Sequence, residues 1–295
     1  MGSSPLKTTL KTLPIKIAMI VLGLQVAVLM GTGLFDLDGC QAEAKSKKGC
    51  PQIVKDAKKA CDSEIKDDYF IALGNCDNIA DKEERSTCIQ MAKTELKEAK
   101  EDCKDQQDAR KEVCGDLEET YYDPQVDPAN FIDPDTIDSG NANPCFPLVE
   151  GPEWVYEGRD DADTLLERIT VTVTADIKSI EFPVGSGDEF LCRVVRDVVE
   201  EFLGGDEADD ANYQVVEDTD DWYAQDTAGN VWYLGEIAQN FIDGELIDVE
   251  GSWKSGRDSA LPGIIMLASL ATGDVYRQEY YLGDAEGHWQ GGQHG

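Results

Sequence analysis

The side chains best suited to holding a ligand lie in the segment DWYAQDTAGNVWYLGE, residues 221–236. Neighbouring side chains of a strand point to opposite faces, and the turn DTAGN brings a second aromatic pair against the first. The segment is therefore either a stripe of core side chains or a polar and aromatic pocket at a barrel mouth for a small amphipathic ligand. Five side chains would line that pocket: Trp222, Tyr223, Gln225, Trp232 and Tyr233.

Closely spaced acids suggest calcium as the one cofactor to test. Asp133, Asp135 and Asp138 form one group, and residues 206–210 (DEADD) form another. Calcium takes six to eight oxygen ligands, which closely spaced carboxylates in a loop supply. Neither group has the EF-hand pattern, and the alternative is an acidic, well-solvated surface. A calcium-stabilised surface protein is one of three functional hypotheses.

Enzymatic chemistry has little support in the motifs. The only histidines are His288 and His294, so histidine-based triads and histidine-rich metal sites are disfavoured. The patterns G-x-S-x-G and H-E-x-x-H and a phosphate-binding glycine loop are absent from the sequence. A hydrolase that uses paired carboxylates stays open as the second hypothesis, although a chain with 60 acidic residues offers many such pairs. The net charge of −34 argues against nucleic-acid binding.

The cysteines carry the most specific pattern. Six of the nine are spaced 11, 15, 12, 15 and 11 residues apart, which is a palindrome. They lie in a segment rich in Lys, Glu, Ala and Asp, and on a helix these spacings keep each set of three on one broad face. Two antiparallel helices that turn near residue 82 bring equal distances from the turn into register. The predicted disulfides are Cys50–Cys114, Cys61–Cys103 and Cys76–Cys88.

Local signals support the two helices. Pro51 suits a first helical turn, and Asp81 with Glu84 resembles a capping box for the second helix. Zinc or haem binding is disfavoured, because no C-x-x-C pair occurs. Cys145 and Cys192 remain, and we expect them to form a fourth disulfide in the C-terminal domain.

The N-terminus predicts export. Residues 1–16 contain three lysines and no acid, and residues 17–35 are uncharged and almost entirely apolar. Three outcomes are open: cleavage after Ala44, lipidation of Cys40, or an uncleaved membrane anchor. The first two leave eight cysteines, an even number that suits an oxidising compartment. The protein is therefore expected to be extracytoplasmic (periplasmic, at the cell surface or secreted), attached to the membrane only by its leader or a lipid.

The rest of the chain divides by composition. We predict a signal peptide or lipoprotein leader at 1–44, the disulfide-laddered hairpin at 45–118, a Pro- and Asp-rich linker at 119–145 and an acidic β domain at 146–295. Short alternating strands separated by turns predict an antiparallel meander that forms a barrel or a sandwich. The fold class is α+β.

Several motifs of the β domain occur together in known proteins. NPCFPL, DWYAQDTAGNVWYLGE, EGSW, LPGIIM and YRQEYYLG follow one another between residues 143 and 286. This half of the chain resembles a family of exported bacterial proteins of unknown function. The resemblance implies a β-rich exported domain but no catalytic residue. The first functional hypothesis is therefore a non-enzymatic, envelope-associated binding or structural module with a small-molecule or protein partner.

Overall fold

The computed structural model describes residues 49–118 and 121–291. The chain divides into the units Met1–Ala44 and Lys45–Gly295, and all described residues belong to the second. The predicted leader and Cys40 thus lie outside the described residues. Within the described ranges, neither helix combines the length and the hydropathy of a membrane-spanning segment.

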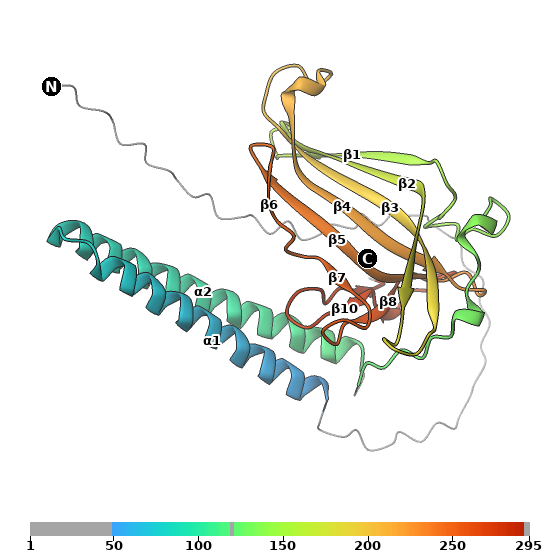
Figure 1. Ribbon diagram of the computed structural model, residues 1–295, viewed down its shortest axis with the longest axis horizontal. Coiled ribbons are helices and arrows are strands. Elements are labelled where there is room, and N and C mark those ends of the chain that lie inside the picture. The colour runs from blue at the N-terminus through green and yellow to red at the C-terminus, as the bar shows by residue number, and fades with distance from the viewer. Residues whose placement is uncertain (1–48, 119–120, 292–295) are drawn as a thin grey trace. The chain divides into compact units, whose positions relative to one another are not determined.

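Two antiparallel helices form the predicted hairpin, α1 (Cys50–Asp77) and α2 (Lys82–Asp116) (Figure 1). Pro51 lies in the first turn of α1. Asp81 caps α2, because its side chain accepts hydrogen bonds from the backbone N–H groups of Glu83 and Glu84. The turn comes at residues 78–81, slightly before the centre that the cysteine spacing predicts.

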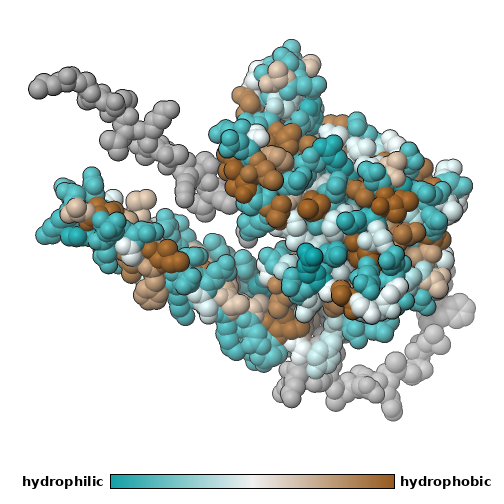
Figure 2. Space-filling view, in the orientation of Figure 1, coloured by the Kyte–Doolittle hydropathy of each residue, from teal (hydrophilic) through white to brown (hydrophobic). Residues whose placement is uncertain are grey.

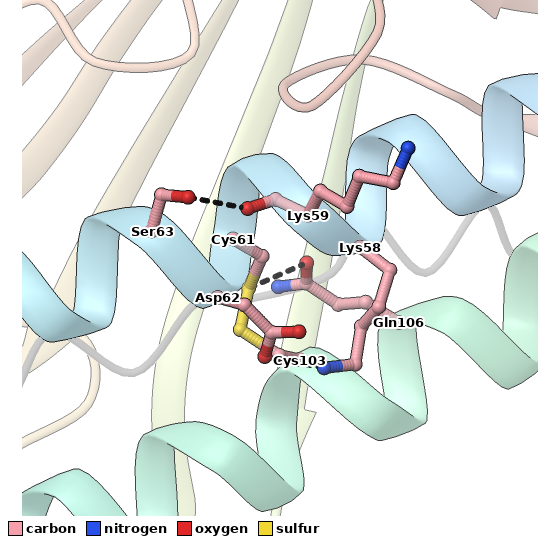
Figure 3. Close-up of a disulfide and its surroundings, with 7 residues drawn as sticks. All are labelled: Lys58, Lys59, Cys61, Asp62, Ser63, Cys103 and Gln106. Atoms are coloured by element: carbon pink, nitrogen blue, oxygen red, sulfur yellow. Dashed lines mark hydrogen bonds and ion pairs between the residues drawn. A yellow bond between two sulfur atoms is a disulfide. The ribbon is translucent and has the colours of Figure 1, made fainter.

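All three predicted hairpin disulfides are confirmed. The Cα–Cα distances are 5.8 Å for Cys50–Cys114, 5.9 Å for Cys61–Cys103 and 5.5 Å for Cys76–Cys88. Figure 3 shows the central bridge joining the two helices, with the amide of Gln106 beside it. Besides half-cystines, the hairpin fully buries only Val54, Ala57 and Ala92 among its apolar residues. Disulfides therefore replace a hydrophobic core here, and they indicate an oxidising, extracytoplasmic environment.

Residues 121–145 are packed on the β domain. Two short 3₁₀ helices, η1 (Pro128–Asn130) and η2 (Pro134–Thr136), each begin with a proline after a capping aspartate. Between them the ring of Phe131 packs edge-on against Phe190 at 5.0 Å, and the Ile132 N–H donates to the Gln225 carbonyl. The Asp–Pro pairs that suggested a linker therefore serve as caps.

The β domain is an antiparallel sheet that curls into a half-barrel (Figure 1). Strand order among the described residues is β1-β2-β3-β4-β5-β8-β10, with β6 and β7 also paired to β5, while β9 and β11 form a separate pair. The strands are β1 (Glu153–Arg159), β2 (Leu165–Glu181), β3 (Glu189–Phe202), β4 (Tyr213–Gln225), β5 (Val231–Ile242), β6 (Glu245–Asp248), β7 (Trp253–Lys254), β8 (Leu261–Met266), β9 (Val275–Arg277), β10 (Glu279–Tyr280) and β11 (His288–Gln290). A further 3₁₀ turn, η3 (Asp210–Asn212), precedes β4.

Each face of the sheet carries its own hydrophobic core. We call the side with Tyr223 and Tyr233 the tyrosine face and the side with Cys192 and Trp222 the Cys192 face. The first core contains Leu148, Val173, Val195, Tyr223, Val231, Tyr233, Trp253 and Ile265. The second contains Ile180, Phe182, Phe190, Cys192, Val194, Trp222, Ala224 and Leu234. Strands buried on both sides explain why β3, β4 and β5 are apolar at successive positions.

The predicted Cys145–Cys192 disulfide is wrong. Both residues are free thiols, Cys145 exposed and Cys192 buried. The segment around Cys145 packs on the tyrosine face, where Phe146 meets Tyr223 at 5.0 Å, while Cys192 lies in the core of the opposite face. The sheet therefore separates the two sulfurs, and the even cysteine count does not distinguish among the outcomes at the N-terminus.

One group of exposed apolar side chains lies at one end of β5. Figure 2 shows a largely hydrophilic surface with a brown patch where β6 lies. Ile242, Leu246, Ile247 and Val249 contribute, each 48–60% exposed.

Candidate functional site

The five aromatic and polar residues predicted to line a pocket divide between the two faces of the sheet. Tyr223 lies directly opposite Tyr233, with their rings stacked at 4.6 Å. Trp232 lies opposite Ala224 on the Cys192 face, where Trp222 also packs. The predicted alternation is confirmed, and only part of the predicted set lies together.

Gln225 and Trp232 have structural roles. The Gln225 side chain is buried, donates to the Asn141 carbonyl and accepts from the Asn143 N–H, so it holds the segment before β1 in place. The Trp232 indole donates to Asp226, the residue that also caps the β4–β5 turn.

A bulge in β5 adds an acid to the tyrosine face. Asp221 pairs with Glu236 and Tyr223 pairs with Tyr233, so three steps along β5 match two along β4. The bulge contains Gly235, whose φ of +139° and close approach to the Trp253 carbonyl leave no room for a Cβ atom. Strict alternation would place Glu236 with Leu234 on the other face; the extra residue turns it toward Tyr233.

The Tyr233 hydroxyl links two carboxyl groups. Its oxygen lies 2.5 Å from Asp221 Oδ1 and 2.5 Å from Glu236 Oε2. A phenol has one hydrogen and donates to one acceptor at a time. The second contact is favourable only if that carboxyl group is protonated and donates to the phenol oxygen. The geometry therefore requires at least one proton on the Asp221–Glu236 pair.

Burial accounts for that proton. Desolvation raises the pKa of Asp221 well above its usual value, and the neighbouring charge of Glu236 adds to the effect. Burial likewise raises the pKa of Glu236, while hydrogen bonds from Tyr233 and Asp221 oppose it. The pKa of the Tyr233 hydroxyl is also raised, first by burial and then by Asp221, so the phenol stays neutral.

Three more acids surround the pair. Burial, with the charges of Glu217 and Glu236, raises the pKa of Asp197 to about 7. Burial and the charge of Glu236 raise the pKa of Glu279 to about 7. Asp197 lies opposite Thr219 on the face that Asp221 shares, and Glu217 lies further along β4. We call Asp197, Glu217, Asp221, Glu236 and Glu279 the acid cluster.

No ion pair involving the acid cluster occurs within the described ranges. Arg193 shares the tyrosine face, but its guanidinium donates to the carbonyls of Pro134 and Ala175 and lies 3.3 Å from Asp135. One oxygen of the cluster, Asp197 Oδ1, is buried and has no hydrogen-bond partner in the described part of the chain. The buried indole N–H of Trp253, which lies across from Glu236, is likewise unpartnered there.

The acids predicted to bind calcium are used differently. Asp133 caps η2, Asp135 approaches Arg193, and Asp138 accepts from the Gly140 N–H. Residues 206–210 also cap turns or pair with Arg159 and Arg168. Across residues 49–118 and 121–291, no group of three or more His, Cys, Asp or Glu side chains is arranged to hold a metal ion. Calcium binding at Asp133, Asp135 and Asp138 therefore stays a prediction.

Sequence reasoning missed Asp197, Glu236 and Trp253. The available signal for Glu236 was Gly235, because an isolated glycine within a strand pattern indicates a bulge. Asp197 and Trp253 come from strands far from the 221–236 segment, and only the sheet register brings them to it.

No family model, curated protein or solved structure matches the chain. The resemblance of residues 143–286 to exported bacterial proteins therefore stays a prediction.

Proposed function

We propose that this protein is an exported, envelope-associated, non-enzymatic binding module whose tyrosine face takes a small ligand with a positively charged or hydrogen-bond-donating group. The observation that carries this proposal is the unpartnered Asp197 Oδ1. A buried carboxylate oxygen without a donor is costly, and a ligand N–H group would satisfy it.

The position of Asp197 suits a binding role. It is half-buried, as is Glu217, whereas Asp221 and Glu236 lie deeper. The outer two acids are thus nearer to solvent, and the inner pair with Tyr233 lies beneath them. An ammonium group at this place would gain from several acids that have no cation of their own among the described residues.

Support for export comes from three features. Three disulfides fit an oxidising compartment. The basic and apolar residues 1–35 fit a leader or anchor, and the motifs between 143 and 286 resemble exported proteins.

The test is a binding assay with defined probes. We expect spermidine or butylammonium, titrated into the full chain at constant ionic strength, to shift amide resonances of β3 and β4 in NMR spectra, whereas butyrate does not. Asp197→Asn should weaken binding at least tenfold. Asp220→Asn is the matched control, since Asp220 lies on the same strand pair but on the opposite face. Equal binding by both variants, or shifts confined to other surfaces, would refute the proposed site.

A carboxylate hydrolase has weaker support. Paired carboxyl groups of a glycosidase need the substrate between them. Here the Tyr233 hydroxyl occupies the space between Asp221 and Glu236. A glycan hydrolysis screen in which one Asp or Glu substitution abolishes turnover would favour the hydrolase over the binding module. A large rise in melting temperature with calcium and none with magnesium would favour the calcium-stabilised protein.

A further inference from the structure

We propose that Asp221, Tyr233 and Glu236 form a proton-dependent latch between β4 and β5, so that the β domain is tight when the carboxyl pair holds its proton and loosens when the proton is lost. The proposal concerns the stability of the domain and does not rest on the proposed ligand.

The latch follows from counting hydrogens. Two carboxyl oxygens contact one phenol oxygen at 2.5 Å each, and Asp221 and Glu236 are direct cross-strand partners. With both carboxyl groups ionised, two negative charges would share a single hydrogen in a buried site. One contact would become repulsive, and β4 and β5 would separate at their bulge.

Three of the strands packed around the latch add charge of the same sign, and Lys254 of β7, opposite Gly235, is not among the groups that shift the pKa of either carboxyl group. Asp197 faces it from β3, Glu217 from β4 and Glu279 from β10. Tyr223 on β4 is neutral, because burial and these acids raise the pKa of its hydroxyl. Arg193 on β3 is a cation on this face, and its guanidinium is directed to Pro134, Ala175 and Asp135. None of these groups offsets a second negative charge on the pair.

The raised pKa values of the buried acids determine the sign of the pH dependence. The unfolded chain loses carboxyl protons near pH 4, while the folded domain keeps them to higher pH. The folded state therefore binds more protons between pH 4 and at least pH 7, where Asp197 and Glu279 titrate. The stability that these protonated acids contribute is fully present below pH 4 and is lost as pH rises. The folding constant falls by up to about tenfold per pH unit for each proton.

The experiment compares Asp221→Asn with the unchanged full-length protein from pH 5 to pH 8. An asparagine keeps the shape and the hydrogen bond to Tyr233 without a titrating proton. We expect the variant to match the parent at pH 5 and to unfold at a higher denaturant concentration at pH 8. Asp188→Asn, an exposed acid in the β2–β3 connection, removes the same charge and should leave the pH slope unchanged.

A second measurement covers the case in which the variant fails to fold. Carboxyl ¹³C NMR of the parent protein should show Asp221 or Glu236 still protonated at pH 6, when exposed acids are ionised. Ionisation of both at pH 6, or equal destabilisation of Asp221→Asn at every pH, would overturn the latch.

Discussion

At the scale of single residues, Gly235 decides which side chains meet on the tyrosine face. Its positive φ permits the bulge, and the bulge moves Glu236 to the side of Asp221 and Tyr233. A Cβ atom at this position would lie 2.4 Å from the backbone oxygen of Trp253. Gly235 thus makes it possible for the Tyr233 hydroxyl to bridge the carboxyl groups of Asp221 and Glu236.

We therefore expect Gly235→Ala to destabilise the β domain by about 3 kcal/mol or more, because backbone strain and a backbone clash add. Denaturant unfolding followed by tryptophan fluorescence measures the change. Gly244→Ala is the control: Gly244 also has positive φ, in the β5–β6 turn, but no atom lies near its Cβ position. It should cost about 1 kcal/mol. Equal losses for both variants would show that the contact with β7 is unimportant.

The same residues show what the sequence could and could not predict about the site. Alternation correctly predicts that Trp222 and Tyr223 lie on opposite faces, and the turn correctly predicts that Trp232 and Tyr233 come from the facing strand. It could not predict the position of Glu236, because a bulge breaks the period of two on which alternation depends. The position of Asp197 could not be predicted either, because its cross-strand partner depends on the register of β3 on β4.

At the scale of elements, the hairpin and the β domain differ in how predictable they were. Helical rise and a mirror-symmetric spacing define one nested pairing for six cysteines, and the structure confirms it. The predicted pairing of Cys145 with Cys192 rests only on their being the two cysteines that remain. No geometric argument linked them, and the sheet lies between them. The meander was predictable from its turns: Asp226 caps one, and Asp243 and Gly244 both have positive φ in another.

The hairpin depends on its disulfides because its helices bury so little. Replacing both Cys61 and Cys103 by alanine should destabilise the hairpin by about 2–4 kcal/mol, the usual contribution of one disulfide. Hydrogen exchange of α1 and α2 amides measures this loss, and the amides of β3 and β4 should keep their protection. Cys145→Ser is the control, as its thiol is exposed and unpaired. Unchanged exchange in the double variant would mean that helix packing alone holds the hairpin.

At the scale of the whole molecule, charge is the dominant feature. Residues 117–295 contain 40 acidic and 8 basic side chains, for a net charge of −32. Two of the few arginines are each shared between two acids: Arg159 between Glu157 and Glu207, and Arg168 between Glu200 and Asp210. The remaining acids repel one another, and such self-repulsion destabilises a compact state.

Salt should therefore stabilise the protein at neutral pH. Raising sodium chloride from about 0.02 M to 0.5 M shortens the screening length from roughly 20 Å to about 4 Å, which weakens repulsion between distant acids more than it weakens short ion pairs. If roughly 1–2 kcal/mol is relieved, the melting temperature at pH 7 rises by about 3–6 °C. The same scan near pH 4.2, where the sequence is close to zero net charge, is the control and should show little salt effect. A fall in melting temperature with salt at pH 7 would mean that the arginine ion pairs outweigh the repulsion among the acids.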